Sequence, residues 1–142
     1  MATSNAATTY LEHRLLNFIF KNNAAISGTT FATPGDSIYV GLATAVSDVE
    51  AATGSSGYTE ATFGGYVRKQ VTASNWTLAS ASTDAQTVTN AANIEFPAST
   101  GTSNTISHVI ITDNSSTGGG NVLFIGALDA NKTIATGDIF RI

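Results

Sequence analysis

The chain has 142 residues, of which only 11% are charged, and it contains two histidines and no cysteine. The net charge of −4 argues against nucleic-acid binding, which needs clustered Lys and Arg. The lack of cysteine excludes disulfides and cysteine-ligated metals. Enzymes usually concentrate ionisable groups with tunable pKa values, so this composition favours a protein that presents surfaces and uses no cofactor.

The length predicts a single β-rich domain over residues 1–142. Residues 1–8 are small and polar, so we expect a flexible N-terminal arm and no signal peptide. The apolar runs are much shorter than the ~18 residues that a membrane span needs. Apolar residues at helical spacing predict one amphipathic helix over residues 10–22. Its apolar face holds Leu11, Leu15, Phe18 and Ile19.

After the helix, short β-branched and aromatic blocks alternate with turn residues, which predicts strands. The predicted strands are 38–43, 66–71, 76–78, 85–89, 93–96, 106–112, 122–128, 133–135 and 139–142. The long, small and polar stretch 44–57 predicts a surface loop. Alternation along 66–71 places Val67 on one face and Arg68 on the other.

Many short strands with turn signals between them predict a mainly β fold, either an antiparallel β-sandwich or a jelly-roll-like barrel with one N-terminal amphipathic helix. No helix-sized spacing separates the strands, so a doubly wound parallel sheet is not expected. The predicted core consists of Leu11, Leu15, Phe18, Ile19, Ile38, Val40, Val67, Val71, Trp76, Phe96, Val109, Ile111, Leu123, Ile125 and Ile139.

Ser107 and His108 come nearest to a catalytic pair, with Asp113 or Asp84 as a possible third member. Adjacent strand residues point to opposite faces, so we do not expect Ser107 and His108 to hydrogen-bond. A half-exposed strand histidine is the favoured interpretation. The histidines lack metal-ligand spacing, so no metal site is predicted. The run Gly118–Gly120 lacks the Lys-Ser/Thr pair of a phosphate loop and is predicted to serve a turn.

The carboxylates are dispersed along the chain, and no paired spacing suggests glycoside hydrolysis. No catalytic residue is therefore predicted. Exposed aromatic rings stack sugars in carbohydrate-binding sandwiches, and three residues are candidates for that role: Tyr58, Tyr66 and Trp76. Core packing is the favoured interpretation for Trp76.

An ordered set of short blocks runs along nearly the whole chain. The blocks are Leu15-Leu16, 39–43, 60–62, 65–68, 75–77, 94–98, 108–113, 126–128 and Gly137-Asp138. In this order they resemble a loose family of small β-rich virion structural proteins of tailed bacteriophages, of the head-decoration or tail-fibre-like type. The resemblance implies a virion component with no catalytic residues, made in the cytoplasm of the bacterial host.

We therefore expect a non-enzymatic capsid decoration (cement) protein, which binds the major capsid protein and copies of itself and stabilises the shell. The alternative is a tail adaptor or a small tail-fibre-like host-binding protein, whose aromatic residues would contact a glycan. A free carbohydrate-binding or hydrolytic β-sandwich is a third interpretation. A homo-oligomer is expected, with neither nucleic acid nor membrane as a partner. Small flexible segments commonly become ordered on a partner, so contacts are expected at Thr3, Asn5, Val49, Gly54, Asn114 and Gly119.

Overall fold

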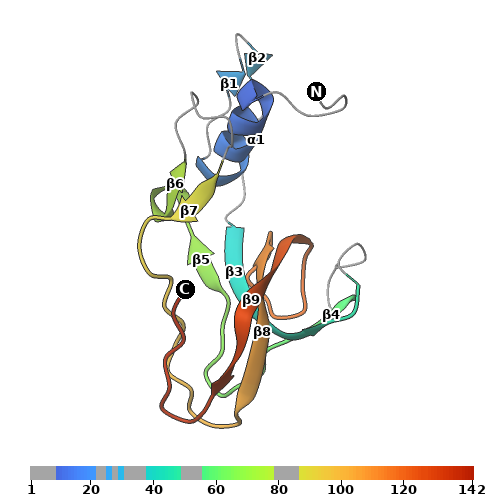
Figure 1. Ribbon diagram of the computed structural model, residues 1–142, viewed down its shortest axis with the longest axis vertical. Helices are drawn as coiled ribbons and strands as arrows, with labels where there is room; N and C mark the ends of the chain where they lie inside the picture. The colour runs from blue at the N-terminus through green and yellow to red at the C-terminus, as the bar shows by residue number, and fades with distance from the viewer. Residues whose placement is uncertain (1–8, 22–24, 27–28, 31–37, 49–55, 79–86) are drawn as a thin grey trace. The chain divides into compact units, whose positions relative to one another are not determined.

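The protein forms two compact units, which are described separately (Figure 1). The computed structural model describes residues 9–21, 25–26, 29–30, 38–48, 56–78 and 87–142. We call Met1–Asp36 with Thr72–Ala92 the helical unit, and Ser37–Val71 with Asn93–Ile142 the sheet unit. The single domain predicted from the chain length stays a prediction.

The helical unit contains the predicted N-terminal helix. Helix α1 spans Thr9–Lys21, one residue earlier at each end than predicted. No helix within the described ranges is long and apolar enough to cross a membrane. The other elements are β1 (Ala25–Ile26), β2 (Thr29–Thr30), the 3-10 turn Ala73–Asn75, β6 (Trp76–Leu78) and β7 (Val88–Asn90). Strand β1 pairs with β2, and β6 pairs with β7, both antiparallel.

The last turn of α1 anchors this unit. The ring of Phe20 packs edge-on against that of Trp76, with 4.8 Å between centroids, and both residues are buried. The Lys21 ammonium donates to the carbonyl oxygens of Ala73 (2.7 Å) and Trp76 (3.0 Å). The core role predicted for Trp76 is therefore confirmed. The core role predicted for Leu15 is wrong, because its side chain is 52% exposed, and the ring of α1 that packs against Trp76 is that of Phe20.

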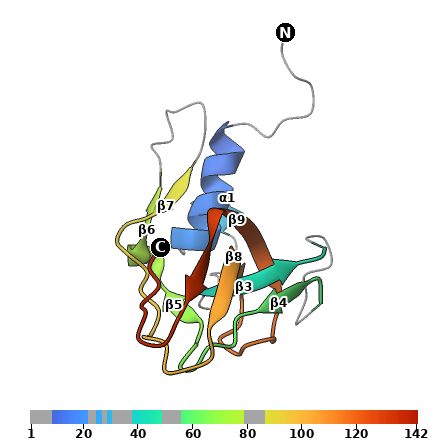
Figure 2. The ribbon, with the colours of Figure 1, turned by 60° about the horizontal axis from the view of Figure 1, so that its bottom comes forward.

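The sheet unit is built on five antiparallel strands (Figure 2). They are β3 (Ile38–Val46), β4 (Tyr58–Glu60), β5 (Lys69–Val71), β8 (Asn104–Thr112) and β9 (Val122–Ile134). The order is β4-β3-β8-β9, and β5 also pairs with β3. Among the described residues β9 pairs with β8 alone, so this sheet is open and does not close into a barrel. The predicted mainly β, antiparallel fold with one N-terminal helix is confirmed.

Several predicted strands have different bounds. The segments 122–128 and 133–135 form one continuous strand, β9. The segments 93–96 and 139–142 are not regular strands. They are joined by backbone hydrogen bonds between Ile94 and Ile142 (2.9 and 3.1 Å) and from Phe96 N to Phe140 O (3.0 Å), with an isolated bridge between Glu95 and Arg141. Only Lys69–Val71 of the predicted strand 66–71 is extended, because Gly64 and Gly65 form a turn just before it.

Apolar side chains from β3, β8 and the 94–96 segment fill the core of the sheet unit. The most deeply buried are Val40, Leu42, Ile106, Ile110 and Phe96. Of the predicted core of this unit, Val40, Val71 and Phe96 are buried, and Ile38, Val109, Ile111 and Ile125 are partly buried.

Three predicted core residues of the sheet unit are exposed: Val67 (53%), Leu123 (42%) and Ile139 (42%). Leu123 lies on the edge strand β9, which pairs only with β8 among the described residues. Val67 points outward because its neighbour Arg68 points into the unit, where its guanidinium pairs with a buried glutamate carboxylate, that of Glu60. Of the remaining predicted core, Phe18 and Ile19 are partly buried, and the side chain of Leu11 lies outside the described residues.

Candidate functional site

The most unusual feature of the sheet unit is a buried ion pair in a chain with few charges. Glu60, at the end of β4, and Arg68, just before β5, are 8% and 5% exposed. Arg68 Nε donates to Glu60 Oε1 (2.7 Å) and Nη2 donates to Oε2 (2.8 Å), which makes the pair bidentate. The turn at Gly64-Gly65 reverses the chain between them and brings the two side chains together.

Three hydroxyl groups make further hydrogen bonds to this pair. The Tyr58 hydroxyl accepts from Arg68 Nη2 (3.1 Å), and that of Thr112 accepts from Nη1 (3.1 Å). The Tyr66 hydroxyl donates to Glu60 Oε1 (2.7 Å) and accepts from the backbone N–H of Leu42 (2.9 Å). Paired charges are tolerated inside a protein when such additional hydrogen bonds complete them.

The electrostatics follow from this geometry. Burial, with the Glu60 charge adding to it, raises the pKa of the Tyr58 hydroxyl, and burial likewise raises the pKa of Tyr66. Burial by itself lowers the pKa of Arg68. The hydrogen bonds and charge of Glu60 outweigh that effect and hold this pKa above its usual range. At neutral pH the tyrosines are therefore neutral and the arginine is charged.

The network supports the loop Asp113–Asn121, which joins β8 to β9 and which we call the contact loop. Arg68 Nη1 donates to the carbonyl oxygens of Asn114 (2.8 Å) and Gly119 (2.9 Å). The backbone N–H of Gly118 donates to Glu60 Oε2 (2.7 Å). Both charges thus bind the backbone of the contact loop from within the unit.

The contact loop is also closed at its base and braced within. Asp113 accepts from the backbone N–H (2.6 Å) and side-chain amide (2.8 Å) of Asn121, and these hydrogen bonds lower the pKa of Asp113. Asn114 Oδ1 accepts from the N–H of Ser116 (2.8 Å). Gly118 and Gly120 have φ of +71°, a conformation that favours glycine. The turn role predicted for Gly118–Gly120 is therefore confirmed.

The outer surface of the contact loop is polar and uncharged. Residues 114–117, with the sequence Asn-Ser-Ser-Thr, are exposed, whereas Gly119 is partly buried and binds Arg68 through its carbonyl group. The predicted contact residue Asn114 is thus accessible. The other predicted contact residues, Thr3, Asn5, Val49 and Gly54, lie outside the described residues.

The predicted separation of Ser107 and His108 is wrong. Ser107 Oγ lies 2.7 Å from His108 Nδ1. The register of β8 against β9 shifts between Ile106 and His108, and such a bulge disturbs the alternation of side chains. The predicted half-exposed position of His108 is confirmed. Asp113 is bound to Asn121, Asp84 lies outside the described residues, and no described carboxylate hydrogen-bonds to His108.

The three aromatic candidates for sugar stacking are mostly packed inside. Tyr58 and Trp76 are 6% and 7% exposed, and Trp76 belongs to the helical unit. The Tyr66 ring is partly buried between those of Phe63 (5.3 Å between centroids) and Phe96 (6.2 Å). All three rings take part in packing, and the glycan-binding role given to them stays a prediction.

Sequence reasoning missed the Glu60–Arg68 pair, and it treated both residues as scattered charges. A usable signal was present: two opposite charges on either side of Gly64-Gly65, among Tyr58, Phe63 and Tyr66, in a chain with 11% charge. Within the described ranges, no group of three or more His, Cys, Asp or Glu side chains is placed to hold a metal ion. The arrangement fixes a loop and presents its outer surface.

Comparison with known proteins gives one family. Residues 6–142 match the family described as "Podophage GP4 fiber I protein gp80". No curated protein matches the chain. The family match covers nearly the whole sequence and confirms the resemblance to structural proteins of tailed-phage virions.

Proposed function

This chain belongs to the family of the podophage GP4 fiber I protein gp80, and from that membership we propose that it is a non-enzymatic structural subunit of a phage tail fibre. Membership of this family makes the chain a phage virion structural protein. The fibre position follows the name of the family. Both support a protein that works through contacts with other virion components.

A role in binding other virion components is supported by the contact loop, whose backbone is held by the buried Glu60–Arg68 ion pair. The charged side chains of Glu60 and Arg68 and the phenol of Tyr58 are buried and bound to one another. They face the inner side of the contact loop and leave its outer side chains exposed. A polar loop on a rigid scaffold is a common way to present a binding surface. We propose that residues 114–117 contact a neighbouring virion protein.

The capsid-decoration role predicted from the sequence stays a prediction, and copy number separates it from the fibre role. Quantitative mass spectrometry of purified particles, with the major capsid protein as internal standard, gives copies per virion. A fibre subunit predicts roughly 3 to 24 copies, following tail symmetries. Hundreds of copies would contradict the fibre role and favour decoration of the shell.

The contact role of the loop has its own test. Replacing both Ser115 and Ser116 by Lys places two charges on the exposed part of the loop, away from the ion pair. The variant should fold but should be incorporated into particles at a reduced level. The matched control is the same pair of changes at Thr102 and Ser103, which are exposed elsewhere in the sheet unit. Equal incorporation of both variants would exclude the contact loop as an assembly surface.

A further inference from the structure

Strand β9 forms a long edge of the sheet unit. It has 13 residues, most of them exposed, and it pairs only with β8 among the described residues. An edge strand presents backbone N–H and C=O groups to which another chain can pair, and proteins usually block it with Pro, with charged side chains or with a covering segment. Strand β9 contains no Pro, and its only charged residues, Asp129 and Lys132, have opposite signs.

A large bulge separates the middle of β9 from β8. In the ladder between the two strands, Lys132 lies opposite Ile106, and Ala127 lies opposite His108. Between these two pairs β8 contributes one residue, whereas β9 contributes the four residues 128–131. These four residues have no partner in the β8 ladder, and most of them are exposed. Their backbone groups are therefore available to a second chain at this edge.

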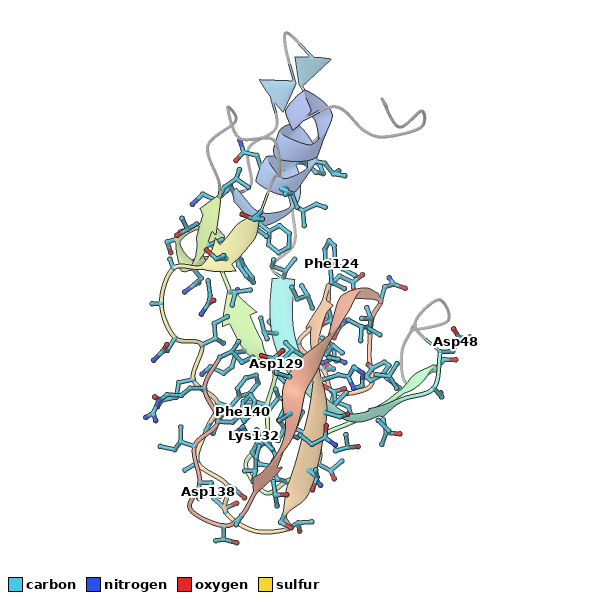
Figure 3. The ribbon with its side chains drawn as sticks, viewed as in Figure 1. Asp48, Phe124, Asp129, Lys132, Asp138 and Phe140 are labelled. Atoms are coloured by element: carbon cyan, nitrogen blue, oxygen red, sulfur yellow. The ribbon has the colours of Figure 1, made fainter. Side chains whose placement is uncertain are left out.

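The two charged side chains of β9 are available as well. Asp129 and Lys132 follow one another along this strand (Figure 3), and both residues are exposed. The ion pairs of the described residues join Arg68 to Glu60 and Arg141 to Glu95. Neither the Asp129 carboxylate nor the Lys132 ammonium has a hydrogen-bond or ion-pair partner in the part of the chain that the structure describes. The exposed edge thus carries one anion and one cation, three residues apart.

These two charges make β9 complementary to itself in one antiparallel register. When two copies of β9 pair around a centre between Ala130 and Asn131, Asp129 of each copy lies opposite Lys132 of the other. Opposite charges that face each other across two strands stabilise the pair, and like charges destabilise it. A register centred on Asp129 or on Lys132 places two like charges opposite each other, and so does a parallel pair in register. The charges therefore select a single arrangement.

We propose that β9 pairs with β9 of a second copy, antiparallel, around a two-fold axis between Ala130 and Asn131. Both copies use the same surface, so the contact is isologous and closes at a dimer. Two symmetry-related pairs between Asp129 and Lys132 fix the register. The dimer does not depend on where the protein sits in the virion, and it therefore goes beyond the fibre role.

Charge reversal tests this dimer in the full-length protein. Self-association is measured by sedimentation velocity over a concentration series at low ionic strength, where exposed charges are screened least, and circular dichroism checks that each variant folds. Wild type should form dimers and nothing larger. Asp129→Lys and Lys132→Asp should each raise the dissociation constant at least about tenfold, because each change places like charges opposite one another twice. The double variant D129K/K132D should recover the dimer.

The two single variants also control for each other. D129K makes the net charge less negative and K132D makes it more negative, so a general effect of charge would act on them in opposite directions. Lys69→Asp, on β5, repeats the charge change of K132D away from β9 and should dimerise as wild type does. An equimolar mixture of D129K and K132D should form 1:1 dimers, because one variant carries two positive and the other two negative charges at these positions.

Disulfide cross-linking tests the register itself, because the chain has no cysteine of its own. Ala130 of one copy lies opposite Asn131 of the other, so a mixture of the A130C and N131C proteins should form the mixed disulfide on oxidation. Each variant alone should cross-link poorly, since adjacent residues of paired strands point to opposite faces.

Several results would overturn the proposed dimer. These are a wild type that stays monomeric at about 1 mM, opposite effects of D129K and K132D on the dissociation constant, an effect of K69D equal to that of K132D, or a mixture of A130C and N131C in which each variant cross-links only to itself. Copy number and position in the virion are measured separately, so the fibre role can stand if this contact fails.

Discussion

The sharpest prediction about stability concerns the buried ion pair between Glu60 and Arg68. Changing Arg68 to Met removes the guanidinium but leaves the Glu60 carboxylate 8% exposed, with only the Tyr66 hydroxyl and the Gly118 N–H as donors. Breaking a buried pair in this way typically costs ~3–5 kcal/mol, because an uncompensated charge stays inside. Whole domains are stable by only ~5–15 kcal/mol, so this single change should remove much of the stability of the sheet unit.

The chain contains its own control for this prediction. Arg141 pairs with Glu95 through the same Nε–Oε contact, also at 2.7 Å, but both side chains are 51% exposed. Exposed pairs typically contribute only ~0–1 kcal/mol. Arg141→Met should therefore shift the unfolding midpoint little, although it removes the same group at the same distance.

The assay is urea unfolding followed by far-UV circular dichroism, which reports on the strands. The single tryptophan, Trp76, lies in the helical unit, so its fluorescence is not a direct probe of the sheet unit. Hydrogen exchange at the Gly118 amide gives a local readout, because that amide donates to Glu60. Protection there should fall in R68M and persist in R141M. Similar losses of stability in both variants would refute the argument from burial.

Three further predictions concern the stability of the protein. Gly41→Ala should destabilise the protein by ~1–3 kcal/mol in thermal unfolding, because the added Cβ would lie 2.9 Å from the Tyr66 hydroxyl oxygen. The control Gly126→Ala should be near neutral, because its added Cβ would meet nothing within 4 Å. Equal effects of the two variants would contradict this account of the packing around Gly41. Burial raises the pKa of Tyr66 above 10.0, so the contribution of Tyr66 to stability should be constant below about pH 10 and be lost above it, and the stability of Tyr66→Phe should fall less steeply in this alkaline range. If the two units fold as one domain, the transitions from Trp76 fluorescence and from circular dichroism should coincide, and separate midpoints would show that they do not.

The sequence predicts a strand well where a run of β-branched residues ends in polar turn residues. Strands β3 and β8 carry β-branched residues that end in polar turns, and both appear close to their predicted positions. Alternation identifies two faces but does not say which face is covered. Leu123 shows this limit, because it is apolar by sequence but is 42% exposed on the edge strand β9.

The candidate site was predictable only in part. The contact loop could be anticipated from its Asn, Ser and Gly residues, which favour turns. What supports it could not, because Arg68 points inward only where Glu60 and two carbonyl groups meet it, and those contacts come from segments far apart in sequence. The Ser107–His108 contact depends on a bulge, which is a property of the pairing with β9 and leaves no mark in the local sequence.

Cryo-electron microscopy of the intact particle tests the central claim most directly. The fibre role predicts density for the sheet unit on the tail, with residues 114–117 of the contact loop against a neighbouring chain. Density for the sheet unit on the outer surface of the capsid shell, repeated over the capsomers, would contradict the fibre role. Density on the tail in which the contact loop faces only solvent would contradict the role given to that loop.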